Sequence, residues 1–276
     1  MSYLRSMFIF LITVRTAFKD GLYDIAHSLQ RINMAFYFAW GDTKARYRRS
    51  ILGPFWIVLS TAVSVAGLGF LWSALLKDEP SKLVPSLTVG LVIWQFISGC
   101  ILESSSLLVR NAHFIRNMSI PYFIFPIQLL MRQLINFGHN FIVVIAVLAF
   151  YPPQFSAVQL LLFPGLILII GNLAWIVLLL AMVGARFRDF EQIIGALMPL
   201  MFFLSPVIYR SSQLTMGQEI IWLNPFTYLI TLIRDPIMGT QPPLFVYEVA
   251  ISALLIGGTL SIYQFGKRRG KIAFWI

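Results

Sequence analysis

Residues 160–183 read LLLFPGLILIIGNLAWIVLLLAMV, a continuous apolar run without a charged side chain. A transmembrane α-helix needs roughly 20 such residues to cross the hydrocarbon core. Similar runs recur along the chain, which is 58% hydrophobic and 12% charged, whereas a soluble domain carries about 25% charged residues. Because backbone polar groups in lipid must be paired within their own segment, the sequence predicts an all-α integral membrane protein.

The apolar runs predict six transmembrane helices in a single domain over residues 1–276, which no linker-like stretch divides. The expected bundle covers residues 52–265, with helices at 52–76, 85–109, 122–150, 160–183, 192–209 and 246–265.

The 21 lysines and arginines are placed unevenly between these helices. Most of them lie on one side of the expected bundle, in residues 1–51, 109–121, 184–191 and 266–276. Loops rich in Lys and Arg stay in the cytoplasm, so both termini are expected there, in a multi-pass protein of the bacterial inner membrane. This topology also accounts for the net charge of +10, and no nucleic-acid partner is expected.

The segment 7–14 resembles the apolar core of a signal peptide. Arg15 and Lys19 follow it without a small-residue cleavage site, so we expect the segment to be retained. Cys100 is the single cysteine, which excludes an internal disulfide.

Residues 20–50 predict an amphipathic helix that lies at the membrane interface before the first span, with Asp20 as its N-cap. Spacings of three and four residues place an apolar stripe on one face and polar residues on the rest. The stripe is Leu22, Ile25, Leu29, Ile32 and Phe36, and the polar surface is Asp24, His27, Ser28 and Arg31. The alternative is that the stripe packs on a partner subunit or on the bundle.

Residues 210–245 form the longest connection between the expected spans. Their apolar piece 220–233 is interrupted by Asn224-Pro225, so it is too apolar for a free loop and too broken for a span. Irregular backbone at membrane depth is tolerated where it is buried in protein or lines a wet cavity. The pattern predicts an external re-entrant helical hairpin that closes a pathway. The alternative is a flat loop with Trp222 and Tyr228 in the aromatic belt.

Polar side chains share one face of the third expected span. They are Gln128, Arg132, Asn136, His139 and Asn140, of which the last four are candidates to line a pathway. The alternative is interhelical hydrogen bonding, or pairing of Arg132 with Glu103 of the second span. His139 has no second ligand-type residue at metal spacing, so no metal site is expected.

A basic cluster stands directly before the first span. Arg46, Tyr47, Arg48 and Arg49 either anchor the topology or bind the phosphates of a lipid substrate. Flat aromatic faces suit sugar rings, so the preceding Tyr37, Phe38 and Trp40 are candidates for contact with a lipid-linked substrate.

A series of motifs runs in order from this cluster to the C-terminal tail. They are RYRRSILGPFW at 46–56, RFRD at 186–189, FLSPVIY at 203–209, NPF at 224–226, RDP at 234–236 and KRRGK at 267–271. The set resembles the polysaccharide-export branch of the ABC-2 type transporter permeases, from about residue 20 onward. The resemblance is strongest to O-antigen export permeases, with capsule and teichoic acid exporters as near relatives.

The resemblance implies a homodimer bound to two copies of a cytoplasmic ABC ATPase subunit. It implies export of polyprenyl-diphosphate-linked glycan, such as the O-antigen of lipopolysaccharide, by a subunit that is not an enzyme and has no catalytic residues. The chain has no G-x-x-x-x-G-K-[ST] phosphate loop, so ATP and Mg²⁺ are expected on the partner and no cofactor on this chain.

Two segments are expected to serve the transport cycle. The residues expected to contact the ATPase are Arg110, Asn111, His113, Phe114, Arg116 and Asn117. The residues expected to form the external gate are Trp222, Asn224, Pro225, Phe226, Tyr228 and Arg234.

Two other functions are weighed against export of a glycan. A small-molecule exporter of the same superfamily shares the architecture, although the basic cluster and the hairpin argue against it. A membrane transferase acting on lipid-linked sugar needs paired carboxylates or a base with a metal. The 11 acidic residues and 3 histidines are scattered instead.

Overall fold

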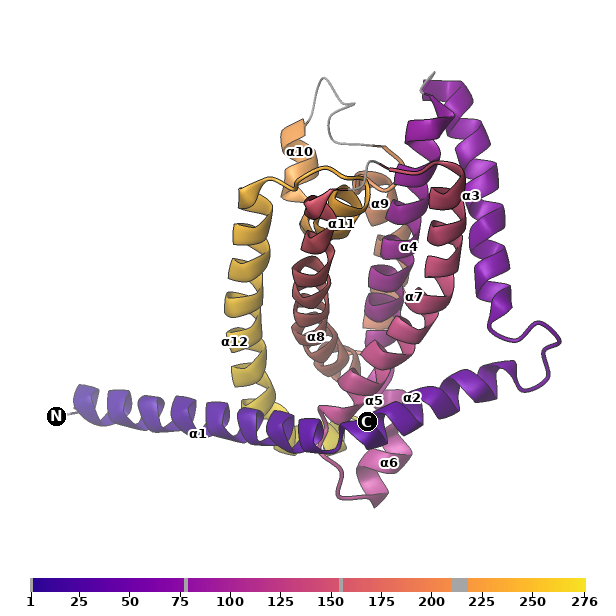
Figure 1. The fold of residues 1–276 in the computed structure, drawn as a ribbon. Helices are drawn as coiled ribbons and strands as arrows, with labels where there is room; N and C mark the ends of the chain where they lie inside the picture. The colour runs from indigo at the N-terminus through magenta and orange to yellow at the C-terminus, as the bar shows by residue number, and fades with distance from the viewer. Residues whose placement is uncertain (1, 77–78, 154–155, 210–217) are drawn as a thin grey trace.

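The computed structural model describes residues 2–76, 79–153, 156–209 and 218–276, and these parts of the chain are helical without any strand. The surface helices α1 and α2 lie across one end of the long helices (Figure 1). The long helices are α3 (Phe55–Leu76), α4 (Pro80–Ser104), α7 (Ile124–Phe150), α8 (Leu162–Arg186) and α12 (Leu244–Trp275). The remaining elements are α1 (Ser2–Gln30), α2 (Ile32–Tyr47), α5 (Leu107–Arg110), α6 (Ala112–Asn117), η1 (Ala157–Leu161), α9 (Phe190–Leu204), α10 (Gln218–Leu223) and α11 (Pro225–Ile237).

Five helical segments are long and apolar enough to cross a membrane. They are Phe55–Leu75, Pro80–Ser104, Ile124–Phe150, Ala157–Arg186 and Leu244–Trp275. The span predicted at 192–209 corresponds to α9, whose 15 residues are fewer than the roughly 20 that a span needs. Helix α9 ends because Pro206 follows, and the residue before a proline is driven out of the helical region: Ser205 is extended at φ −92° and ψ 146°.

The predicted ends of the long helices shift for local reasons. Helix α3 begins at Phe55 rather than at residue 52, because Gly53 has a φ of +55° and Pro54 follows it. Helix α4 begins earlier than predicted, with Pro80 in its first turn, where the missing N–H costs no hydrogen bond. Helix α12 runs past the predicted end at Phe265 and carries the basic tail on the same helix.

The prediction of one surface helix over residues 20–50 is wrong in its bounds. Helix α1 is continuous from Ser2 to Gln30, so Asp20 lies in mid-helix and is not an N-cap. The chain turns at Arg31 before α2 begins.

The polar face of α1 is also oriented differently from the prediction. Asp24 and Ser28 are fully buried against the bundle, whereas the stripe residues Leu22 and Leu29 are exposed. On α2, Ile32 and Phe36 are exposed as well. The apolar stripe therefore faces outward, and part of the polar surface provides the contacts with the other helices.

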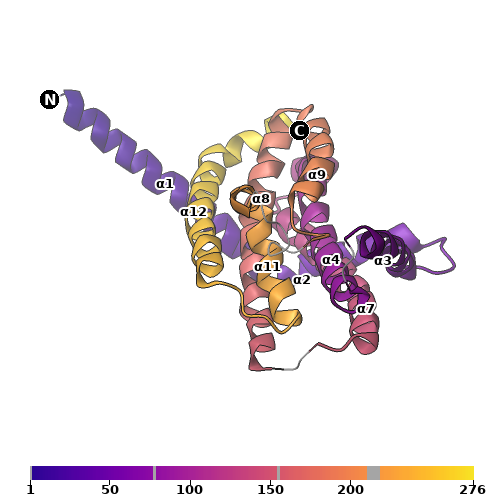
Figure 2. The same cartoon turned by 90° about the horizontal axis from the view of Figure 1, so that it is seen from above.

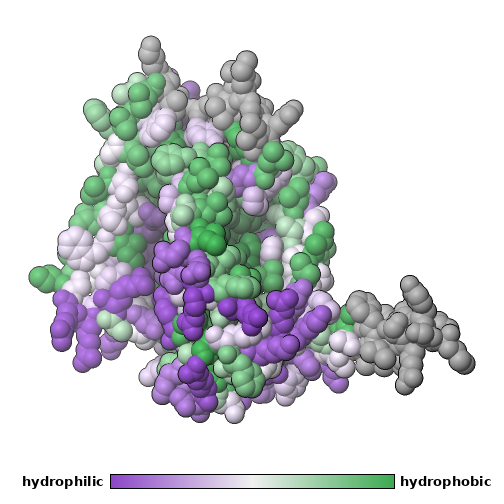
Figure 3. All heavy atoms as spheres, turned by 180° about the vertical axis from the view of Figure 1, so that it is seen from behind, coloured by the Kyte–Doolittle hydropathy of each residue, from purple (hydrophilic) through white to green (hydrophobic). Residues whose placement is uncertain are grey.

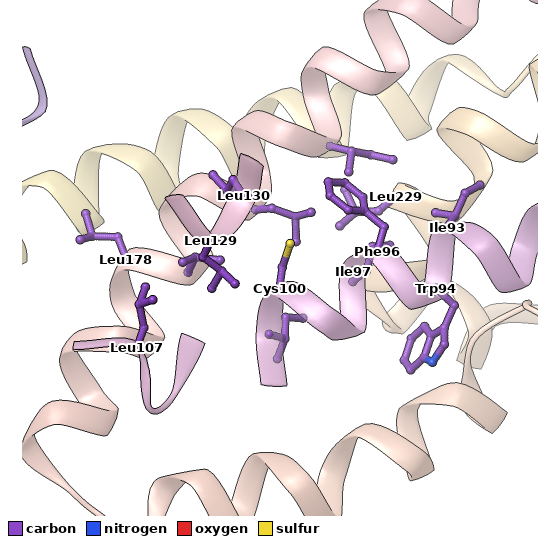
Figure 4. Packing of buried hydrophobic residues seen from close by; sticks show 14 of the residues in the cluster. Ile93, Trp94, Phe96, Ile97, Cys100, Leu107, Leu129, Leu130, Leu178 and Leu229 are labelled. Carbon is purple, nitrogen blue, oxygen red and sulfur yellow. The ribbon is translucent and has the colours of Figure 1, made fainter. Parts of the chain in front are cut away.

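Helix α4 is the centre of the core. Of the residues in the most apolar stretch of α4, 78% are buried, whereas the corresponding share for α3 is 17%. Cys100, in the last turns of α4, is fully buried among Ile97, Leu129 and Leu130 (Figure 4). Seen from above, α3 stands at the edge of the molecule, on the side away from α12 (Figure 2).

The surface is divided by hydropathy in the view from behind. Hydrophilic residues gather at the end where α1 and α2 lie, and the surface beyond them is mainly hydrophobic (Figure 3). This distribution is the one expected of a protein whose long helices are surrounded by lipid and whose surface helices meet water.

Candidate functional site

Charged residues from four helices meet at Glu103, in the last turn of α4. The Glu103 carboxylate pairs with Arg132 of α7 and lies 3.6 Å from a guanidinium nitrogen of Arg46 and 3.6 Å from one of Arg110. Gln133 donates a hydrogen bond of 3.0 Å to the same carboxylate. We call Asp42, Arg46, Glu103, Arg110, Gln128, Arg132 and Gln133 the Glu103 cluster.

Asp42 of α2 completes the ion pairs of Arg132. Its carboxylate accepts a hydrogen bond of 3.1 Å from Arg132 and one of 2.8 Å from Gln128. Arg132 therefore bridges two carboxylates that come from different helices. This confirms the pairing with Glu103 that was considered as the alternative to pathway lining, and it adds Asp42 as a partner.

The arginines of the cluster differ in exposure. The side chain of Arg132 is 12% exposed, whereas those of Arg46 and Arg110 are 47% and 48% exposed. Arg46 and Arg110 line an open pocket of about 520 Å³, together with Asp42, Phe114 and Arg132. Arginine binds phosphate oxygens with paired N–H donors, so two half-exposed arginines in one pocket can bind a phosphate group.

A second, uncharged cluster lies farther along α4 and α7. Asn140 donates a hydrogen bond of 2.7 Å to Gln95 Oε1. Thr61 Oγ1 of α3 lies 3.0 Å from Asn140 Oδ1 and 3.1 Å from Gln95 Oε1. These three residues, the Asn140 cluster, join three helices without using a charge.

The two clusters border a common pocket of about 260 Å³. Arg46 and Glu103 line it as well as Thr61, Gln95, Gln133, Asn136 and Asn140. Two aromatic rings, Phe96 and Phe137, also line it, with centroids 5.3 Å apart. Amides, hydroxyls and aromatic faces together form a lining that suits a sugar.

Only part of the predicted pathway face of α7 therefore lines this pocket. Asn136 and Asn140 line the pocket, whereas His139 lies outside its lining and bonds to the carbonyl oxygen of Ile135 at 2.7 Å. Sequence reasoning missed Thr61 and Gln95. Their polarity inside otherwise apolar spans is the signal that identifies such positions.

The residues of the basic cluster before the first span lie in two different environments. Arg46 belongs to the Glu103 cluster, whereas Arg48 and Arg49 are exposed after the end of α2, next to a half-buried Tyr47. Among the aromatic candidates, Tyr37 and Trp40 are 74% and 52% exposed. Phe38 packs instead on Phe114, with ring centroids 5.5 Å apart.

The segment expected to contact an ATPase forms α5 and α6. Arg110 and Asn111 line the pocket beside the Glu103 cluster, and Asn111 also bonds to the carbonyl oxygen of Leu107. The rest of the set is exposed: His113, Phe114, Arg116 and Asn117. Arg116 donates a hydrogen bond to the carbonyl oxygen of Ile276, so the last turn of α6 contacts the end of α12.

The predicted hairpin contains two short helices, α10 and α11, separated at Asn224; residues 210–217 lie outside the described residues. Asn224 caps α11 by accepting from the N–H of Phe226, and Pro225 occupies the first turn. The side-chain amide of Asn224 donates a hydrogen bond of 2.9 Å to Ser205 Oγ, and this bond connects the hairpin to the end of α9.

Three further gate candidates make structural contacts within this region. Tyr228 donates a hydrogen bond of 2.8 Å to the carbonyl oxygen of Trp222, and their rings pack at 5.3 Å. Arg234 is 3% exposed and donates to the carbonyl oxygens of Pro206 and Tyr209. Arg234 thereby bonds to carbonyl groups of the non-helical segment that follows α9, which ends at Leu204.

Most of the chain is similar in sequence to known proteins. A family model, ABC-2 type transporter, matches residues 35–238. The O-antigen export system permease protein RfbA of Myxococcus xanthus is 25% identical over 240 residues, which cover 84% of this chain and 91% of that protein. Two proteins of the same name from Klebsiella pneumoniae are 24% and 25% identical over 204 and 207 residues, in each case 72% of this chain and 77% of the relative.

Proposed function

Because the chain belongs to the ABC-2 type transporter family, we propose that it is the membrane permease subunit of an ATP-driven polysaccharide exporter. Its substrate is a lipid-linked glycan of the O-antigen type, moved from the cytoplasmic to the outer side of the inner membrane. The names of the three relatives and their coverage of the chain support this substrate class. The observation that carries the proposal is the arginine pocket that adjoins the amide-lined pocket along α4 and α7.

The proposed topology has six spans, with α9 as the short fifth and with both termini in the cytoplasm. Helices α1 and α2 then lie at the inner face with their exposed apolar stripe in the lipid boundary. The placement of lysines and arginines and the hydrophilic end of the molecule in Figure 3 support this orientation. The hairpin α10–α11 then lies at the outer side, as a re-entrant gate.

The proposed path begins at the cytoplasmic end. The diphosphate of a polyprenyl-linked glycan binds Arg46 and Arg110 in the 520 Å³ pocket, and the exposed Arg48 and Arg49 attract it there. Tyr37 and Trp40, which are exposed on the same helix as Arg46, offer aromatic faces to the lipid-linked sugar. Sugar hydroxyls then contact Asn136 and Asn140 in the 260 Å³ pocket.

The energy for transport comes from partner subunits in this proposal. Two copies of the chain associate with two copies of a cytoplasmic ABC ATPase, which holds the ATP and Mg²⁺. The exposed residues of α6 contact the ATPase, because aromatic and arginine side chains are frequent anchors of interfaces. Nucleotide binding biases the permease between two arrangements, as a two-state transporter requires.

The experiment is to purify the chain from its native membrane in mild detergent and to assay the eluate for ATPase activity. We expect an ATPase in about equal amount, stimulated by polyprenyl-diphosphate-linked glycan. The Arg46→Gln variant should require several-fold more glycan for half-maximal stimulation, and the control Arg31→Gln, at the exposed turn between α1 and α2, should not. A chain that purifies alone, with no response to nucleotide, would contradict the proposal.

A further inference from the structure

Asp24 is a buried carboxylate on a helix that the sequence assigns to the surface. Its side chain is fully enclosed, and it accepts hydrogen bonds from the backbone N–H groups of Tyr122 at 3.2 Å and Phe123 at 2.9 Å. These two residues directly precede α7, which begins at Ile124. A carboxylate from α1 therefore lies at the N-terminal end of α7, where the helix dipole favours a negative charge.

The same carboxylate binds a third helix. Arg269 Nε of α12 lies 2.6 Å from Asp24 Oδ2, and the guanidinium group of Arg269 lies over the ring of Tyr122, 5.7 Å from its centroid. The side chain of Arg269 is 35% exposed, whereas that of Asp24 is not exposed at all. One buried carboxylate thus connects α1, the start of α7 and α12.

Close backbone packing reinforces this connection. A Cβ atom on Gly21 of α1 would lie 2.5 Å from the carbonyl oxygen of Ile262, and one on Gly266 of α12 would overlap with the carbonyl oxygen of Ala17. Glycine at both positions lets the two helices approach backbone to backbone, as small residues do between membrane helices. Helix α1 therefore cannot slide along α12 without breaking these contacts.

The junction lies a few residues from the segment that faces the proposed ATPase. Helix α6 ends at Asn117, and the short connection from Met118 to Pro121 leads directly to Tyr122. Within it, the N–H of Met118 bonds to the carbonyl oxygen of Phe114 and that of Ile120 to the carbonyl oxygen of Met118. A displacement of α6 therefore reaches the N–H groups bound by Asp24 through a short, hydrogen-bonded connection.

We propose that Asp24 is a positioning residue that makes α1, the start of α7 and α12 move as one body when the ATPase displaces α6. The inference rests on the proposed function and adds to it the element that receives the motion. Without the Asp24 carboxylate, a displaced α6 bends the 118–121 connection and leaves the start of α7 behind, and the bond from Arg116 to Ile276 is then the link between α6 and α12. ATP is then hydrolysed with less glycan moved per cycle.

The test is the number of glycans exported per ATP hydrolysed by the co-purified complex in proteoliposomes. Asp24→Asn keeps an oxygen acceptor of the same shape and removes the charge that binds Arg269. We expect this ratio to fall about tenfold while the complex still assembles and hydrolyses ATP. The matched control is Asp20→Asn, an exposed carboxylate one turn earlier on α1, for which the ratio should stay unchanged.

A second pair of variants keeps the inference testable if Asp24→Asn fails to assemble. Arg269→Gln leaves Asp24 bonded to α7 and removes only the link to α12, so it should lower the ratio, and Arg269→Lys should restore it in part. An unchanged ratio, or a loss of hydrolysis in proportion to export, would overturn the inference. A wild-type complex without glycan-stimulated hydrolysis would instead overturn the proposed function.

Discussion

Helices α4 and α7 carry two polar clusters, one charged and one neutral. The Glu103 cluster lies where α2 and α5 meet the bundle, and two of its arginines are about half-exposed. The Asn140 cluster lies farther along the same two helices and uses an amide pair and a hydroxyl. A charge in the middle of a membrane is expensive, whereas a paired amide is tolerated. The charged cluster therefore lies near the end of the bundle, and the cluster farther along α4 and α7 is neutral.

The difference matches the chemistry of a lipid-linked glycan. In the proposed function the half-exposed Arg46 and Arg110 bind the diphosphate, and Glu103 is not left unpaired because Arg132 stays bound to it. Sugars need donors and acceptors of modest strength, and the amides and the hydroxyl of the Asn140 cluster are of that kind. Substitutions in the two clusters should accordingly differ in their effect on stability and on substrate use.

The largest effect on stability is expected for Arg132→Met. This change removes the partner that Asp42 and Glu103 share. Because Asp42 is 40% exposed and Glu103 keeps Arg46 and Arg110 nearby, we expect a loss of about 2–3 kcal/mol, less than the roughly 3–5 kcal/mol of a fully buried pair. The measurement is the free energy of unfolding in mixed micelles, with the exposed Arg188→Met as the matched control. A loss below about 1 kcal/mol would show that the ion pairs of the charged cluster contribute little.

An intermediate effect is expected for Asn140→Leu in the neutral cluster. The variant removes the bonds to Gln95 and Thr61, and hydrogen bonds between membrane helices contribute about 0.6 kcal/mol on average, up to about 1.7. The same unfolding measurement applies, with the exposed Ile142→Leu as a control two positions later on α7. A loss as large as that of Arg132→Met would remove the distinction between the clusters.

The smallest effect on stability is expected for Arg110→Gln. Its side chain is about half-exposed, and exposed ion pairs typically contribute no more than about 1 kcal/mol. Substrate use should change more than stability does: the glycan concentration for half-maximal ATPase stimulation should rise several-fold. If stability falls strongly and that concentration stays the same, Arg110 belongs to the scaffold and not to the phosphate site.

The sequence predicted the parts of the fold that depend on apolar runs. Five of the expected spans correspond to long apolar helices, because run length alone determines whether a helix can cross lipid. The ends of α3 and α9 depended on backbone restrictions at Gly53-Pro54 and Ser205-Pro206. These restrictions are visible in the sequence, and they determine the helix ends more closely than hydropathy does.

The polar contacts could be predicted only in part. The pairing of Arg132 with Glu103 was one of two alternatives, since both residues lie inside apolar spans. Asp24 was assigned to the polar surface of the helix and Asp42 was not singled out, because nothing local distinguishes a carboxylate in water from one that binds a distant helix. Asp24 and Asp42 accept hydrogen bonds from α7 and the two residues before it, and these donors are 86 to 99 residues away along the chain.

The most direct test of the central claim is transport by the purified permease with its co-purifying ATPase in proteoliposomes. The substrate is a polyprenyl-diphosphate-linked glycan, added to the side on which the ATPase is exposed, and its arrival on the other side is read with a membrane-impermeant glycosidase. The account predicts movement that requires ATP hydrolysis and that weakens when Arg46 and Arg110 are both changed to Gln. Movement without ATP, or none with an active ATPase present, would contradict it.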